Sequence, residues 1–405
     1  MVILKDMAED RPDGGPARTS IAGPTVTWFE LFYDLVVVAA VSLCNDAYLT
    51  RPSLGTAVAA LLSMAALSWV WFLTTLFNNF FPGDDLARRL LLLGQMAALV
   101  IAALSVDQFE GLSNATGLIA YAVALLIVGL LVLRSHRGPL RVAVLKGSAL
   151  AIGVPAAVCV IGSQLPDKYA GLVLAAALAV SIGTVLTARL PANDSGSVLR
   201  VDHLRERRGL FILIILGEGF AGLVQTLHHL GSIPRGGVFA LTFVLSFALW
   251  WIYFDGTFAE RPGQVIVRWR LSLLAHLTLI YGMAGTLDLL VLLTAQEEAE
   301  LGDSSLLYFA LSLATVFFSF AVLGFTVLGR LGTAGLVQIA SGIIVVVAGL
   351  VVAQGEEASV RTLMIAASIL VVGNALFAVW TERATDSGGW RSALRRVAGS
   401  EDGVP

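Results

Sequence analysis

The sequence predicts an all-α membrane protein with about twelve transmembrane helices, arranged as two parallel six-helix repeats. Composition is the first observation: 57% of the 405 residues are hydrophobic and only 14% are charged. A soluble protein of this size could not cover its surface with so few charges. The formal net charge of −3 gives no indication of nucleic-acid binding, so the expected surroundings are a lipid bilayer.

The second observation is a series of apolar runs of about 17–25 residues, the length that crosses the hydrocarbon core as a helix. Twelve such runs lie at 25–48, 57–80, 88–106, 115–133, 142–162, 169–188, 208–230, 237–258, 269–294, 305–328, 332–353 and 361–381. They divide the chain into a disordered cytosolic tail at 1–24, a first six-helix half at 25–188, a cytosolic linker at 189–207, a second six-helix half at 208–381 and a cytosolic tail at 382–405.

The charged loops support this count and give the orientation. If the chain crosses the membrane twelve times, all but four of its 26 Lys and Arg residues fall on the side that holds both termini. The four exceptions are Arg51, Lys168, Arg235 and Arg361. Because basic loops remain in the cytosol, we expect both termini there, in a multi-pass protein of the inner cell membrane.

A weak internal repeat predicts the two halves. It has an offset of 181 residues and falls in the second and third helices of each half. It pairs Trp69 with Trp250, Phe72 with Tyr253, Leu73 with Phe254, Arg89 with Arg270 and Gln95 with His276. An even number of helices per repeat keeps both halves in the same orientation, related by a pseudo-two-fold axis along the membrane normal.

The first helix carries two carboxylates, Glu30 and Asp34, at the end expected to face the cytosol. A spacing of four residues places both on one helical face. Since a charge near the bilayer centre costs roughly 2.5–3.5 kcal/mol, the pair should face a protein interior, a watery cavity or a partner charge. The alternative is that they lie near the headgroups and cap the start of the helix.

A Pro-Gly turn precedes the third helix, and Asp84 or Asp85 is expected to cap that helix. Adjacent aspartates could also bind a metal, but a helix cap needs no further ligands. Arg89 follows in the first turn, where a cation meets the positive end of the helix dipole. A carboxylate partner for Arg89 is therefore expected, either Asp34 or Asp84.

The seventh helix carries the deepest charge. Glu206 and Arg207 lie at its start, and Glu218 follows about three turns later on the same face as Arg207. Glu218 lies about 15 Å into the helix, near the bilayer midplane, between two glycines that permit close helix approach. It could be a proton-binding group of the function, or a buried carboxylate that only holds helices together.

The end of the eighth helix is aromatic, with Trp250 and Tyr253 just before Asp255. The ninth helix begins near Arg270 and buries His276 less than two turns later. A histidine in a membrane helix is often only a structural hydrogen-bond partner. The internal repeat, however, pairs His276 with Gln95 of the third helix, which is also polar. This pairing indicates two matching polar positions at the pseudo-two-fold axis.

Together these residues resemble the low-temperature-requirement A (LtrA) family of polytopic membrane proteins. The resemblance rests on Glu30-Leu-Phe-Tyr-Asp34-Leu-Val, Asp84-Asp85 with Arg89, His203-x-x-Glu206-Arg207 with Gly217-Glu218, Trp250-Trp251-Ile-Tyr253-Phe254-Asp255, and His276. The motifs of the first and seventh helices are the most specific, and the resemblance runs through both halves in order. It implies a polytopic membrane protein and does not define a molecular activity.

We expect the cytosolic halves of these helices to form one polar cavity at the interface between the repeats. The first hypothesis is a secondary transporter or proton-coupled exchanger of a small molecule or ion, with Glu218 as the protonation site. The alternative is an intramembrane enzyme acting on an isoprenoid or lipid diphosphate, such as a terpene cyclase or a prenyl-transfer enzyme. Mg²⁺ would be a cofactor only in that alternative. A third hypothesis is a structural or sensory protein.

Twelve residues are predicted to form the site. Four are expected to carry the chemistry: Glu218, Asp34, Asp255 and His276. Eight are expected to bind the substrate: Glu30, Arg89, Glu206, Arg207, Arg270, Trp69, Trp250 and Tyr253. The sequence identifies neither a metal site nor a cofactor for the transporter hypothesis.

The predicted topology can be tested with reporter fusions in the loops near Arg137 and Glu298. With twelve helices and a cytosolic N-terminus, a fusion near Arg137 reports the cytosol, and one near Glu298 reports the opposite side. Fusions that placed both loops on one side of the membrane would contradict the helix count.

Overall fold

The computed structural model describes residues 26–50, 53–106, 113–135, 144–145, 147–188, 201–231, 238–257, 268–295, 303–354, 362–378 and 380. Throughout these segments the regular secondary structure is helical. The predicted tails at 1–24 and 382–405 lie outside the described residues, as does most of the predicted linker.

All twelve predicted apolar runs are helical over nearly all of the parts that the structure describes. The elements are α1 (Trp28–Thr50), α2 (Leu54–Phe80), α3 (Leu86–Val106), α4 (Asn114–Arg134), η2 (Ala149–Gly153), α6 (Val154–Gly162), η3 (Asp167–Tyr169), α7 (Ala170–Thr187), α8 (Val201–Leu230), α9 (Val238–Trp251), η5 (Ile252–Thr257), α10 (Trp269–Ala295), α11 (Asp303–Leu328) and α12 (Thr333–Gln354). A last apolar helix spans Thr362–Ala378.

Within the described segments, nine helices are long and apolar enough to cross a membrane, judged by length and composition. The three shorter apolar helices are Ala149–Gly162, Phe239–Phe254 and Thr362–Ala378. The prediction of an all-helical polytopic membrane protein is therefore confirmed. The division into two related repeats stays a prediction.

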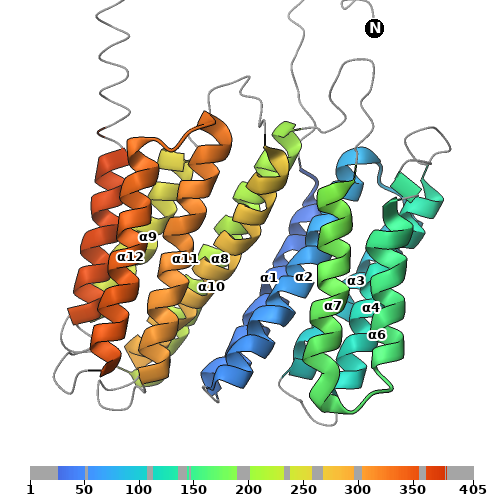
Figure 1. Cartoon of the computed structure of the whole chain (residues 1–405), viewed down its shortest axis with the longest axis horizontal. Coiled ribbons are helices and arrows are strands. Elements are labelled where there is room, and N and C mark those ends of the chain that lie inside the picture. The colour runs from blue at the N-terminus through green and yellow to red at the C-terminus, as the bar shows by residue number, and fades with distance from the viewer. Residues whose placement is uncertain are drawn as a thin grey trace, which may run out of the picture.

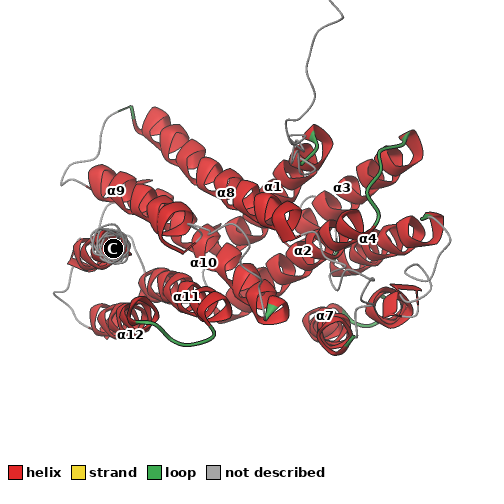
Figure 2. Cartoon of the chain, turned by 90° about the horizontal axis from the view of Figure 1, so that it is seen from above, coloured by secondary structure: helices red, strands yellow, loops and turns green. Residues whose placement is uncertain are grey.

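The helix α1 lies between two sets of helices (Figure 1). It packs against α2 and α3 on one side and against α8 and α10 on the other. Viewed from above, α3, α4 and α7 gather on one side of α1, and α9, α11 and α12 gather on the other (Figure 2). Since α2 also contacts α8 and α10, the two sets meet along α1 and α2.

Local side-chain caps explain where two helices begin. The Ser53 hydroxyl accepts a hydrogen bond from the Thr56 amide at 3.1 Å and starts α2. Asp85 Oδ1 accepts one from the Arg88 amide at 3.0 Å and starts α3, so the predicted cap at this turn is confirmed.

The helix α8 begins at Val201, well before the apolar run that starts at 208. The predicted start of this helix at residue 208 was based on apolar residues alone. The first two turns instead contain polar side chains, among them His203 and Arg207, that are buried against other helices. Because these polar side chains have partners inside the protein, the helix can include a charged segment that hydropathy alone would not assign to a membrane helix.

Two glycines let α10 and α11 approach closely. A Cβ atom added at Gly282 would lie 2.9 Å from the carbonyl oxygen of Ser312 and 2.9 Å from the backbone nitrogen of Val316. One added at Gly285 would lie 2.6 Å from the hydroxyl of Ser312. Because backbone atoms cannot rotate away as a side chain can, the contact at Gly282 fixes the separation of these helices.

We expect Gly282→Ala to lower the free energy of unfolding by about 1–3 kcal/mol, the usual cost of overpacking. The measurement is thermal unfolding of purified protein in detergent. The matched control is Gly324→Ala on α11, where an added Cβ meets no heavy atom within 4 Å. That change should be neutral or stabilising, since alanine favours a helix over glycine. Equal losses in both variants would contradict the close packing at Gly282.

Candidate functional site

A reciprocal cap between Thr27 and Glu30 fixes the start of α1. The Glu30 amide donates to Thr27 Oγ1 at 3.2 Å, and the Thr27 amide donates to Glu30 Oε2 at 3.0 Å. These bonds satisfy two donors that the first turn of a helix otherwise leaves unpaired. The cap uses Oε2 of the carboxylate and leaves Oε1 for contacts inside the protein.

Arg207 on α8 binds both carboxylates of α1. Its Nη1 donates to Glu30 Oε1 at 3.1 Å, and its Nη2 donates to Asp34 Oδ1 at 2.9 Å. Arg207 and Asp34 are 0% exposed and Glu30 is 8% exposed. The predicted shared face of Glu30 and Asp34, with a partner charge opposite it, is confirmed. The alternative also holds in part, because Glu30 caps the helix as well.

Three further side chains contact the carboxylates. Trp71 Nε1 donates to Asp34 Oδ1 at 2.6 Å, and Asn78 Nδ2 donates to Glu30 Oε1 at 3.2 Å. His203 Nε2 lies 3.5 Å from Glu30 Oε2. The charge network is defined here as Glu30, Asp34, Trp71, Asn78, His203 and Arg207.

The charges in this network are unequal when His203 is neutral. Within the network two carboxylates then face one guanidinium, an excess of one negative charge that the nearby guanidinium of Arg88 partly offsets. An uncompensated buried charge is strongly unfavourable, so one additional proton or cation would balance the network. Two buried atoms of this network have no hydrogen-bond partner among the described residues: Nδ1 of His203 and Oδ1 of Asn78.

A cavity of about 110 Å³ adjoins one end of the charge network. Its walls include Glu30, Asn78 and His203, together with Asp84 from the turn before α3 and Arg88 from the first turn of α3. The fully buried pair of Asp34 and Arg207 does not line it. Water in this cavity would therefore reach the network first at Glu30, Asn78 and His203.

A second polar group lies between α8, η5 and α10. Arg208 Nη1 donates to Ser272 Oγ at 3.2 Å, and the Tyr253 hydroxyl lies 3.2 Å from His276 Nε2. All four side chains are buried. Tyr253 and His276 are therefore neighbours, and adjacent arginines of α8 serve two different polar groups.

Arg89 pairs with Asp84 and not with Asp34. Its Nε donates to Asp84 Oδ1 at 2.7 Å, and its Nη2 forms an ion pair with Oδ2. Both side chains are about half exposed, and the hydrogen bond from Arg89 lowers the pKa of Asp84 below its ordinary value.

The neighbouring Asp85 also pairs with an arginine. Besides capping α3, its Oδ1 lies 3.3 Å from Arg134 Nη2. Within the described residues, no group of three or more His, Cys, Asp or Glu side chains could hold a metal ion.

Glu218 does not join the charge network. It is exposed on the outer surface of α8, and Glu206 is exposed near the start of the same helix. The expectation that Glu218 faces a protein interior is therefore wrong, because a helix that is apolar all round does not reveal which face is buried. The role of Glu218 in proton transfer stays a prediction.

The remaining predicted residues lie in separate places. Arg270 donates to the backbone carbonyl of Ala188 at the end of α7. Trp69 Nε1 donates to Ser181 Oγ at 2.7 Å, inside the first set of helices. Trp250 is partly buried and packs against Phe254 with ring centroids 5.7 Å apart. These residues do not form the single cavity wall that the sequence led us to expect.

The predicted site residue Asp255 lies in η5, and its side chain is outside the part that the structure describes.

Three members of the charge network were not among the predicted site residues: Trp71, Asn78 and His203. The spacing of these residues in the sequence could have identified them as members of the site. Trp71 and Asn78 are about two turns apart on one face of α2, and His203 precedes Arg207 by about one turn of α8. Polar residues that repeat at helical spacing opposite a known carboxylate pair would have identified them.

Fold and site together define a class of protein: a polytopic helical membrane protein with a buried charge network between two sets of helices. The family model described as bacterial low temperature requirement A protein (LtrA) matches residues 25–376. The chain therefore belongs to the LtrA family, and the resemblance drawn from its motifs is confirmed.

Among curated proteins, an uncharacterized protein of Rhizobium meliloti (strain 1021) is 28% identical to this chain over 238 residues. The aligned region covers 56% of this chain and 58% of that relative. The match thus spans little more than half the length of either protein.

We expect Arg207→Met to cost about 3–5 kcal/mol of stability, because it leaves two buried carboxylates without their shared cation. Adding Asp34→Asn should recover part of the loss, since one of those charges is then removed. Thermal unfolding of the single and double variants in detergent measures the coupling. Arg89→Met is the control, because that arginine is exposed and should contribute little. Strictly additive effects of Arg207→Met and Asp34→Asn would refute direct pairing.

Proposed function

We propose that this protein is a proton-coupled secondary transporter of the exchanger type, with the charge network as its coupling site. The observation that supports this most is the sharing of one buried guanidinium by two carboxylates. Such a group gains from binding a further positive charge. Ionisable residues inside membrane segments commonly mark ion or proton pathways.

The cavity beside Glu30 gives a route for that charge. His203 lies between the cavity and Glu30, with Nε2 toward the carboxylate and Nδ1 unbonded. A proton arriving from the cavity would meet the side chains of His203 and Glu30 first. Protonation of Glu30 would weaken its bond to Arg207 and leave Arg207 paired with Asp34 alone.

The same weakening would couple proton binding to helix movement. Glu30 and Asp34 belong to α1, Arg207 belongs to α8, and α1 contacts both sets of helices. Loss of one of the two ion pairs lowers the cost of moving α1 relative to α8. Rocking of one helix set against the other is the motion that alternating access requires.

A small cation suits the cavity as the exchanged substrate. Asn78 Oδ1 is a carbonyl oxygen without a hydrogen-bond partner in the described part of the chain, and it lies on the residue that also binds Glu30. Carboxylate and amide oxygens are typical ligands of hard cations. A volume of about 110 Å³ matches an ion with a few waters better than an isoprenoid. The enzyme alternative has less support, since Asp84 and Asp85 both bind arginine side chains.

Exchange can be tested in lipid vesicles that contain purified protein and a trapped fluorescent pH indicator. With an acidic interior, we expect external sodium or potassium chloride to drive proton efflux through the wild-type protein. Glu30→Gln and Asp34→Asn should each lower this flux by an order of magnitude or more, because each removes a charge that titrates or pairs in the network. Asp167→Asn, which changes an exposed carboxylate of η3, is the control and should leave the flux unchanged.

Two outcomes would contradict this proposal. The first is a folded wild-type protein that gives no cation-driven proton flux. The second is a loss of flux in Glu218→Gln but not in Asp34→Asn, which would move the coupling site to the outer face of α8.

A further inference from the structure

We infer that Asp288 is a second proton-binding site, at the end of α1 opposite to the charge network. Asp288 belongs to α10, a helix long and apolar enough to cross a membrane, and its side chain is partly buried. A carboxylate in such a segment is costly to keep charged, and ionisable residues there commonly mark proton or ion pathways. The inference rests on the proposed transport only for the use that the bound proton would have.

The central helix α1 relates this site to the charge network. Asp34 and Asn45 are eleven residues apart on α1, or about 16 Å along its axis, and both are 0% exposed. Eleven residues are close to three turns, so both side chains lie on one face of the helix. Asp34 binds Arg207 of α8, and Asn45 binds Asp288 of α10. One buried face of α1 thus has a carboxylate at each of its ends.

Two hydrogen bonds define the contact of Asn45 with Asp288. Asn45 Nδ2 donates to Asp288 Oδ2 at 2.5 Å, and the Tyr308 hydroxyl donates to Asn45 Oδ1 at 2.7 Å. Tyr308 therefore holds the amide with its nitrogen toward the carboxylate. Because Asn45 is neutral, its hydrogen bond stabilises the ionised carboxylate without cancelling the charge. A carboxyl oxygen accepts this bond in both protonation states, so Asp288 can bind and release a proton while it keeps Asn45.

Close helix packing holds Asp288 in place. A Cβ added at Gly219 of α8 would lie 2.9 Å from Cβ of Leu287, the residue before Asp288. One added at Gly285, about one turn earlier on α10, would lie 3.2 Å from the hydroxyl oxygen of Tyr308 on α11. Since α10 is in close contact with α8 and α11 around this position, the carboxylate is kept beside α1.

The helices that pack against α10 bring few titratable groups to this end. These groups are Asp46 of α1, Glu218, His228 and His229 of α8, and Asp303 and Tyr308 of α11. Glu218 and both histidines are exposed, and the side chains of Asp46 and Asp303 lie outside the described part of the chain. The helices α2 and α9 contain no charged residue. Among the described side chains in this list, Tyr308 is therefore the one joined to Asp288, through Asn45.

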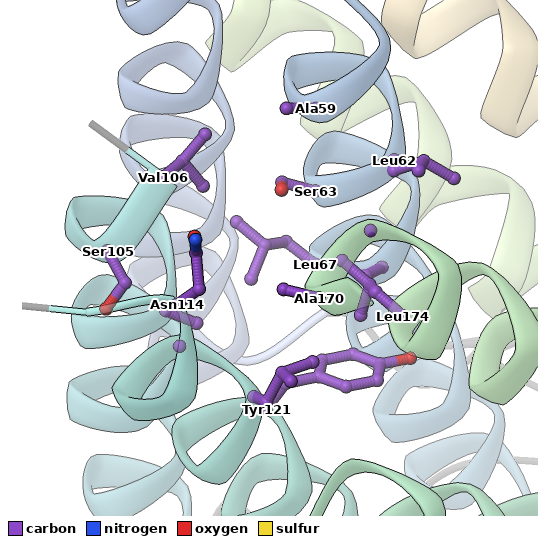
Figure 3. Close-up of a pocket in the computed structure, with 15 residues that line it drawn as sticks. Ala59, Leu62, Ser63, Leu67, Ser105, Val106, Asn114, Tyr121, Ala170 and Leu174 are labelled. Atoms are coloured by element: carbon purple, nitrogen blue, oxygen red, sulfur yellow. The ribbon is translucent and has the colours of Figure 1, made fainter. Parts of the chain in front are cut away.

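The first set of helices has a different kind of pocket toward this end. It lies between α2, α3, α4 and α7, beside the first half of α2 (Figure 3). Its walls are mostly apolar, as at Leu62, Leu67 and Leu174, and none of the described residues that line it is charged. A proton that enters here meets a carboxylate beside α1 and none in this pocket.

Two carboxylate sites on one helix face suit the proposed exchange. The cavity beside Glu30 reaches the charge network at one end, and Asp288 is bound to α1 at the other. The face between them carries Val37, Val41 and Cys44, which are buried. Valine side chains cannot carry a proton, so transfer between the two ends would require movement of α1.

The test measures protonation of Asp288 with dicyclohexylcarbodiimide, an apolar reagent that adds to protonated carboxyl groups. Full-length protein in lipid vesicles is labelled in a series of buffers from acidic to alkaline, and mass spectrometry quantifies the adduct on Asp288. We expect the adduct in acidic buffer and at least a tenfold loss of it in alkaline buffer. Asn45→Ala removes a donor to the charged form and should raise the pH of half-maximal labelling by about one unit.

The matched control is Asn374→Ala, which removes a buried amide that donates to Ser341 on another pair of helices. It should leave the midpoint of Asp288 labelling unchanged. Exposed Glu218 of the same protein is an internal reference, and its midpoint should be the same in every variant. Tyr308→Phe removes the bond that orients Asn45 and should give a smaller upward shift, which keeps the test decisive if Asn45→Ala does not fold.

Three results would overturn this inference: no adduct on Asp288 in folded wild-type protein, an adduct that does not change with pH, or equal midpoints in wild type, Asn45→Ala and Tyr308→Phe. Proton flux separates the inference from the transport proposal. A protein whose Asp288 titrates as expected, but which gives no cation-driven flux, would contradict transport and support this site.

Discussion

One buried guanidinium, that of Arg207, joins the two sets of helices in this protein. It reaches from α8 to two carboxylates of α1, and α1 in turn packs against both sets. Without it, Glu30 and Asp34 would be charges in a low-dielectric interior with only neutral donors around them. The start of α8, the buried face of α1 and the side chains of Trp71 and Asn78 on α2 all meet at this group of charges.

The network buries two carboxylates, and we propose that it also couples ion binding to movement. Neutral donors from Trp71 and Asn78 lower the cost of burying the carboxylates but cannot remove their excess charge. A cavity reaches Glu30 and His203, while Asp34 stays enclosed. A group with an excess negative charge and a cavity at one end is suited to the proposed coupling of ion binding with movement of α1 against α8. A purely structural ion pair would need neither the unequal charge nor the cavity.

The helices could be predicted because bilayer thickness sets their length, and the pair of Glu30 and Asp34 could be predicted because helical spacing places both on one face. Their partner could not, since Arg207 is 173 residues from Asp34 and no local pattern links them. Arg89 had two candidate partners, and only the folded chain selects Asp84. Glu218 was misplaced for a related reason. In a membrane helix both the lipid-facing and the protein-facing sides are apolar, so hydrophobicity gives the length of a helix and not its rotation.

The account rests on the claim that the charge network binds one exchangeable proton. Difference infrared spectroscopy of the protein in lipid, recorded between alkaline and acidic buffer, tests this claim directly. We expect a carboxyl or imidazole signal that titrates in wild-type protein and disappears in Glu30→Gln/Asp34→Asn. A spectrum in which the wild type and this double variant titrate identically would show that the network keeps a fixed charge, and the account would then be wrong.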